Sequence, residues 1–154
     1  MMKLEENLGY LLFRTHKALK KGFVAVLKEY DLTDRQFAVL FRLYVNEGLS
    51  AVDLVERLSS DSSTLVAVID KLESKSLLRR EDDPRDRRAK RLFLTSQAKE
   101  LMPHLVMRLT DLERERRKVL SQKEIKILIS TLTKLQRYYE PAEKKIFSAA
   151  SARG

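Results

Sequence analysis

The stretch that decides the fold is residues 72–95, LESKSLLRREDDPRDRRAKRLFLT. Residues 78–81 and 90–94 read as two short strands, because Leu92 and Leu94 fall on one face of an extended chain. The charged segment between them is longer than the roughly two to five residues of a tight hairpin loop. We therefore expect an antiparallel hairpin with a long charged loop.

Helices are expected on both sides of this hairpin. A long first helix is predicted from Leu4 to Tyr30, where apolar residues recur every three, four or seven positions. Capping patterns predict where the later helices begin: Thr33 with Gln36, Ser50 with Asp53, Asp61, Thr95, and Ser121 with Glu124. Gly48 and Pro141 are expected to end the second and the last helix, and Pro103 to bend the one before it.

This order of elements is that of a winged helix-turn-helix. The predicted fold class is mainly α with a small β hairpin, in a single domain over 1–154. Within it, 33–95 form the winged lobe, and 4–30 and 96–140 form flanking helices. Because one small lobe cannot cover the apolar stripes of three long helices, we expect these helices to dimerise. The alternative is a monomer whose terminal helices fold back over the lobe.

Composition excludes several classes of function. The formal net charge is +9, and the absence of cysteine removes disulfides, thiolate metal sites and thiol redox sensing. The apolar runs are too short to span a bilayer and no signal peptide is recognisable, so a cytoplasmic protein is expected. We expect no metal site, because the only two histidines, His16 and His104, lack carboxylates at ligand spacing. No cofactor is expected. No enzyme is expected either, because a phosphate loop and a nucleophile with its partners are both missing.

The charge of the hairpin points to nucleic acid. Residues 79–91 hold seven basic and four acidic side chains, so the loop can follow a phosphate backbone and insert an arginine into a narrow minor groove. The outer surface of the helix after Asp61 would face the major groove. The candidate DNA-contacting residues are Ser50, Ser62, Ser63, Thr64, Val66, Ala67, Lys71, Arg79, Arg80, Arg85, Arg87, Arg88 and Lys90. A charged hairpin that is merely solvated is the alternative reading.

The sequence resembles the MarR family of bacterial transcription regulators from about Leu4 to Tyr139. The similarity lies in 72–80, 83–88 and 92–95, which match the family's recognition-helix end, wing and return strand. It implies a homodimer whose two winged lobes read a pseudo-palindromic duplex. It also implies control by small anionic aromatic ligands, or by cysteine oxidation in some branches; the second is excluded here.

The chain departs from the family pattern in two places. Ser76 stands where the family usually has glycine, a residue that suits a left-handed turn at a helix end. Val66 and Ala67 stand where Thr and Arg are frequent, so base readout by hydrogen bonds should be weak and contact with thymine methyls more important.

A ligand pocket is expected where the dimerisation helices meet the lobes. The candidate residues are Tyr10, Phe13, Arg14, His16 and Arg108, which suit a planar phenolic or aromatic carboxylate. Each of them also has an ordinary core or surface interpretation. The function expected overall is a dimeric DNA-binding regulator, a repressor released by such a ligand. The alternative is a winged-helix module that binds RNA or protein without operator specificity.

Overall fold

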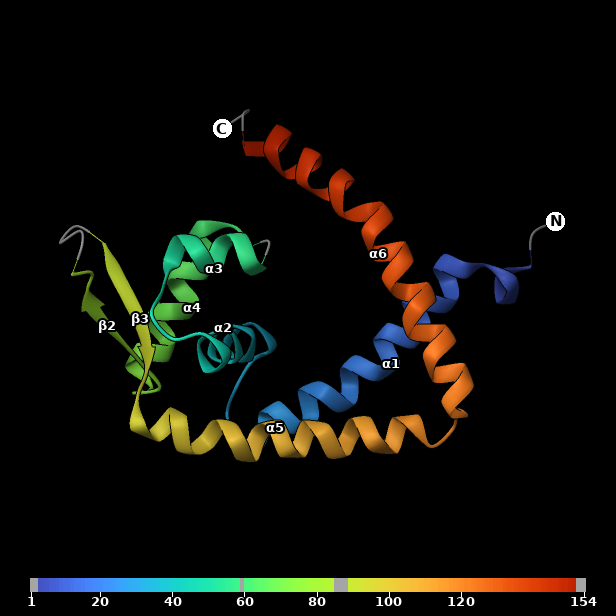
Figure 1. Ribbon diagram of the computed structural model, residues 1–154, viewed down its shortest axis with the longest axis horizontal. Helices are drawn as coiled ribbons and strands as arrows, with labels where there is room; N and C mark the ends of the chain where they lie inside the picture. Colours follow the sequence, from blue (N-terminus) through green and yellow to red (C-terminus); the bar gives the residue numbers. More distant parts are fainter. Residues whose placement is uncertain (1–2, 59, 85–88, 152–154) are drawn as a thin grey trace. The chain divides into compact units, whose positions relative to one another are not determined.

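The computed structural model describes residues 3–58, 60–84 and 89–151, with side chains as far as Tyr139. The chain divides into two compact units, Met1–Leu112 and Glu113–Gly154. Its elements (Figure 1) are η1 Leu4–Glu6, α1 Leu8–Lys28, α2 Asp34–Val45, β1 Leu49–Ser50, α3 Ala51–Leu58, α4 Ser62–Ser74, β2 Leu78–Asp82, β3 Lys90–Leu94, α5 Ser96–Arg117 and α6 Gln122–Ser151. The predicted class, helices with a small hairpin in winged-helix order, is confirmed.

Side-chain caps begin the helices where the sequence predicted them. Thr33 and Gln36 form a reciprocal capping box at α2, and the Thr95 hydroxyl accepts from the Ala98 amide at 3.2 Å at the start of α5. The Ser121 amide and hydroxyl donate to Glu124 ahead of α6. These contacts depend on residues only three positions apart, so the sequence alone specifies them.

Three predicted boundaries are wrong. The first helix does not run from Leu4, because the Asn7 side chain accepts from the Tyr10 amide and begins α1 after a short 3-10 turn. Helix α2 ends at Val45 rather than at Gly48. Helix α6 does not stop before Pro141 but continues to Ser151, because helix-forming Ala, Glu and Lys residues follow the proline. Helix α5 contains Pro103 in its interior, and the bend expected there stays a prediction.

The sheet has a third strand that the sequence did not predict. Strand order is β1-β3-β2, with Leu49 opposite Leu92 and Leu78 opposite Leu94. Gly48, at φ +76°, turns the chain into β1, and its amide donates to the Leu92 carbonyl at 3.0 Å. A Cβ there would lie 3.4 Å from the Phe93 ring, so Gly48 serves the sheet edge rather than the end of a helix.

The core of the first unit is aliphatic. Fully buried leucines come from each of α1 to α4, the sheet and α5, and Phe23 packs edge-on against Phe37 at 5.5 Å between ring centroids. Burying each such leucine is worth about 1.5–3 kcal/mol. The buried positions are Val26, Leu27, Leu32, Val39, Leu40, Leu43, Leu49, Leu54, Leu65, Ile69, Leu72, Leu77, Leu78, Leu92, Leu94, Ala98, Met102 and Leu105. This core fixes α4 and the hairpin as one lobe.

Among the helices that the structure describes, none is both long enough and apolar enough to span a membrane.

Candidate DNA-binding surface

The N-terminus of α4 is held by the carboxylate of Asp61. This carboxylate accepts from the Thr64 amide at 2.7 Å and from the Ser63 hydroxyl at 2.8 Å. The hydrogen bonds from Thr64 and Ser63 lower the pKa of Asp61 to about 2. The group is therefore ionised at neutral pH, and its negative charge suits the positive end of the helix dipole.

Helix α4 has one buried and one exposed face. Leu65, Ile69 and Leu72 are buried in the core. The predicted contact residues on α4 are all on the outer side: Ser62, Ser63, Val66, Ala67 and Lys71 are exposed, and Thr64 is half-buried. The Val66 side chain, 47% exposed, and Ala67 offer methyl groups and no hydrogen-bonding atoms to a groove.

Ser50 lies at the end of β1 and serves as a cap. Its amide and hydroxyl donate to Asp53 Oδ2 at 2.7 and 2.8 Å, and its oxygen accepts from the Asp53 amide at 3.2 Å. These bonds begin α3 and lower the pKa of the Asp53 carboxyl. Ser50 is thus a structural cap of the helix that precedes α4.

The wing is formed by β2 and β3, and the basic side chains on these strands are ion-paired. Arg79 pairs with Glu81 and lies over the Phe93 ring at 5.1 Å. Lys90 Nζ lies 2.5 Å from Asp82 Oδ1, and Arg91 Nε donates to Asp83 at 2.7 Å. Such pairs order the cations along the hairpin and partly neutralise their charge locally.

Arg80 connects the wing to α4. Its guanidinium pairs with Asp70 and Glu73, both on α4, and the Asp70 and Glu73 carboxylates raise the pKa of Arg80 above its usual value. Arg80 was predicted from the sequence to contact DNA, and its pairing with Asp70 and Glu73, ten and seven residues away, was not predicted. A charge pattern of Asp, Glu and Arg at those separations is the only signal available.

Arg85, Arg87 and Arg88, the predicted contacts at the tip of the wing, lie outside the residues that the structure describes. Their role remains a prediction from the sequence.

Comparison with known proteins agrees with this architecture. A family model described as MarR family matches residues 32–90. The HTH-type transcriptional regulator TtmR of Methylorubrum extorquens is 30% identical over 123 residues, which cover 76% of this chain and 63% of TtmR. The chain belongs to the MarR family. It spans less than two thirds of the length of the curated relatives it matches.

Two solved structures of similar proteins resemble this MarR-family chain over most of its length. The structure of Bordetella bronchiseptica BpsR, a protein whose DNA binding is regulated by 6-hydroxynicotinic acid, has a TM-score of 0.78 at 27% identity and covers 88% of this chain and 97% of that one. The transcriptional repressor CouR, bound to a 23-mer DNA duplex, has a TM-score of 0.79 at 27% identity, covering 88% and 98%. The described part of the winged lobe therefore has the fold of these family structures.

The residues predicted to bind a ligand are divided between two places in this MarR-family chain. Arg14 Nη1 donates to the Tyr10 hydroxyl at 3.0 Å near the start of α1. Arg108 pairs with Glu29 at 3.1 Å, about 22 Å further along the helix at ~1.5 Å per residue. Within one chain, the structure does not bring the two arginines together.

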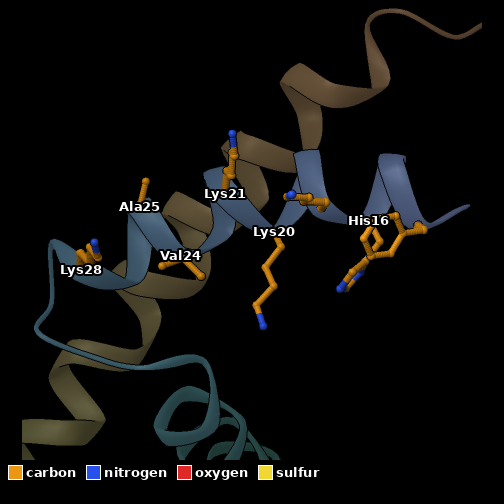
Figure 2. Close-up of a pocket in the computed structure, with 8 residues that line it drawn as sticks. His16, Lys20, Lys21, Val24, Ala25 and Lys28 are labelled. Atoms are coloured by element: carbon orange, nitrogen blue, oxygen red, sulfur yellow. The ribbon is translucent and has the colours of Figure 1, made fainter. Parts of the chain in front are cut away.

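A cavity of about 510 Å³ lies along one face of α1. Phe13 and His16, two of the predicted residues, are in its lining, which also includes Lys17, Lys20, Lys21, Val24, Ala25 and Lys28. Figure 2 shows Lys20 and Lys21 projecting from opposite edges of this face, with Val24 between them. Lys20 pairs with Asp34 at 2.8 Å. The lysines were not predicted as ligand residues, although their spacing of three, four and seven places them on one helical face.

Proposed function

We propose that this MarR-family chain is a transcription regulator that binds double-stranded DNA in a sequence-specific way. The observation that supports it best is the exposed N-terminal half of α4 beside a basic wing, which Arg80 connects to α4. A helix end of this kind enters the major groove while a hairpin contacts the adjacent backbone. CouR, similar in structure, is solved in complex with a DNA duplex.

The regulator acts as a homodimer in this proposal. The N-terminal half of α1 exposes large apolar side chains at Leu8 (57%), Leu11 (46%) and Leu19 (42%). On α6, Ile127 and Ile129 are more than half exposed. Water-exposed apolar stripes on long helices favour burial against a second copy. A twofold dimer would read two half-sites about 34 to 36 Å apart, one helical turn of DNA.

The regulator is a repressor released by an anionic aromatic acid. Lysines around an apolar floor on α1 suit such a molecule: the ammonium groups attract the carboxylate, and Phe13 and Val24 offer surface to the ring. The proposal assigns Arg14, Tyr10 and Arg108 to the same ligand site. Because one chain does not bring the two arginines together, the second copy in the dimer would complete the site on this face of α1. BpsR, whose structure is similar, responds to 6-hydroxynicotinic acid. A ligand releases DNA only if it binds one lobe spacing more tightly than another.

Capture of genomic DNA fragments on the purified protein, followed by sequencing, tests the DNA-binding proposal. The expected result is one enriched pseudo-palindrome, with an affinity that falls steeply as salt rises because phosphate contacts release counterions. Lys71→Gln, on the outer face of α4, should weaken binding. Lys134→Gln, an exposed lysine on α6, is the charge-matched control and should not. Equal binding to single-stranded or hairpin RNA would instead support the alternative RNA-binding module.

Titration of 6-hydroxynicotinate and salicylate against the protein on its captured fragment tests the ligand proposal. Release of DNA is expected, and Lys21→Gln, Arg14→Ala or Arg108→Ala should each blunt it. Equal release in all three variants would place the ligand elsewhere, and no release would reject this ligand class.

A further inference from the structure

Two helices of the first unit end in the same unusual way. Asp31 after α1 (φ 52°) and Ser76 after α4 (φ 56°) both have left-handed backbones, although neither is glycine. After α4, the Leu77 amide donates to the Leu72 carbonyl at 3.0 Å and the Ser76 amide to the Glu73 carbonyl at 2.9 Å. The amides of Leu32 and Asp31 make the same pair of bonds after α1. Both ends are therefore Schellman corners.

The side chain of Lys75 joins these two corners. Lys75 is the C-cap of α4, and its Nζ donates to the Asp31 main-chain carbonyl and, at 2.8 Å, to the Asp31 carboxylate. The Lys75 side chain is only 22% exposed, whereas that of Asp31 is 95% exposed. Because water screens the carboxylate, the bond to the carbonyl is the more important half of this contact.

Thr95 attaches α5 to the same place. Its hydroxyl donates to the Ser76 carbonyl at 2.7 Å and its amide donates to the Leu77 carbonyl at 3.3 Å. The same hydroxyl oxygen caps α5 by accepting from the Ala98 amide. The end of α4 is thus bonded to the end of α1 on one side and to the start of α5 on the other.

We propose that Lys75 and Thr95 are positioning residues that fix the orientation of α4 relative to α1 and α5. This inference rests on the proposed DNA-binding function and concerns how that function is controlled. Lys75 lies at the opposite end of α4 from Ser62, about 20 Å away at ~1.5 Å per residue, so it acts through α4 rather than on DNA. A movement of α1 or α5 would then turn the face of α4 that meets the groove.

Lys75→Met and Lys71→Met form a matched pair on one helix. Lys71, exposed and one turn before Lys75, is expected to contact phosphate, so Lys71→Met should weaken specific and non-specific DNA binding alike and flatten the salt dependence by about 0.9 in log–log slope. Lys75→Met should weaken binding to the captured operator fragment by about fivefold or more. It should leave the salt slope and non-specific affinity unchanged. A flattened slope for Lys75→Met would overturn the proposal.

Asp31→Asn separates positioning from phosphate contact in a second way. Asparagine tolerates the left-handed conformation and keeps the main-chain carbonyl, so only a slightly weaker operator affinity is expected. The double variant with Lys75→Met should bind no more weakly than Lys75→Met alone, because both changes act on one contact. If Lys75 instead contacts DNA, freeing it from Asp31 should tighten binding, which would overturn the proposal. Thr95→Val should weaken operator binding as Lys75→Met does. Thr95→Ser, which keeps the hydroxyl, should retain the affinity of the parent protein.

Hydrogen exchange without DNA tests the contact between Lys75 and the end of α1 independently of the proposed function. In Lys75→Met, the Leu32 and Asp31 amides, 43 and 44 residues away in sequence, should lose protection. If the parent protein shows no operator preference, the DNA-binding proposal fails, but this measurement still tests whether Lys75 holds the end of α1. Unchanged protection at both amides would overturn it.

Discussion

The outer face of α4 and the wing that follows it differ in what they can offer DNA. On α4 the central exposed side chains, Val66 and Ala67, carry only methyl groups. On the wing the described strand cations are charged but already paired with carboxylates, as Lys90 is with Asp82. The centre of the α4 face therefore offers shape without hydrogen-bonding groups, and the wing offers charge that is partly satisfied within the hairpin and by α4.

We expect this difference to divide DNA affinity and base specificity between the two surfaces. Charged groups on a wing increase affinity for any duplex, whereas base identity is read by the side chains in the major groove. With methyl groups at the centre of α4, we expect discrimination to depend on thymine methyls and on DNA shape. The ion pairs of Arg80 with Asp70 and Glu73 connect the wing to α4.

Substitution on the buried face of α4 should have the largest effect. Ile69 is 1% exposed, and Ile69→Ala should lower the free energy of unfolding by about 2 to 5 kcal/mol, because it removes buried methyl groups and leaves a cavity. Urea denaturation measures this. Val66→Ala, on the opposite face of the same helix, is the control and should change stability by less than about 0.5 kcal/mol. Equal losses would mean that the two faces are not distinct.

Loss of an arginine at the wing tip should weaken DNA binding without unfolding the protein. We expect Arg88→Ala to reduce the binding free energy by about 1 to 3 kcal/mol, because arginine suits a narrow minor groove. Binding assays at constant salt measure this, with sedimentation to confirm that assembly is unchanged. Arg137→Ala, an exposed arginine on α6, is the matched control. Affinity within twofold of the parent would remove Arg88 from the interface.

The α4 face should be sensitive to single methyl groups on DNA. Replacing thymine by uracil in the half-sites should reduce affinity by about fourfold at positions next to Val66 or Ala67, since a buried methylene-sized group is worth ~0.8 kcal/mol. Val66→Ala should diminish that difference at its own position only. Competition binding with a series of singly substituted duplexes provides the measurement. Identical affinity for every duplex would show that these residues read no bases.

The parts of the fold that the sequence predicted are those set by near neighbours. The capping box of Thr33 with Gln36 and the alternation of Leu92 and Leu94 are both readable within a few residues. The two-residue strand β1 was missed because its partner, β3, lies more than 40 residues away. The same holds for Lys75 with Asp31, and for Arg108 with Glu29, 79 residues apart.

For the candidate site residues, the sequence predicted which side chains are exposed but not which partners they contact. Helical periodicity correctly indicated that Val66 and Ala67 are exposed while Leu65 and Ile69 are buried. It could not show that Arg80 pairs with Asp70 and Glu73 on α4, or that Arg108 pairs with Glu29. These features depend on which charges the folded chain brings together.

The smallest expected effect concerns Ser76, which connects α4 to the wing. A left-handed backbone costs a non-glycine residue roughly 1–2 kcal/mol, and glycine would remove that cost while adding roughly 0.5–1 kcal/mol of unfolded-chain entropy. Ser76→Gly should therefore stabilise the protein by less than about 1 kcal/mol. Ser76→Val, with a branched side chain at the same exposed position, should instead destabilise it.

Thermal unfolding of the Ser76 variants, together with operator binding, checks this balance. The bonds from Thr95 to the Ser76 and Leu77 carbonyls involve only main-chain acceptors of the corner, so Ser76→Gly should preserve them and leave DNA affinity unchanged. A glycine variant less stable than the parent would show that chain entropy outweighs backbone strain at this corner. A stable variant with weakened operator binding would show that the stiffness of the Ser76 corner, and not only its hydrogen bonds, holds α4 and the wing in the orientation that DNA requires.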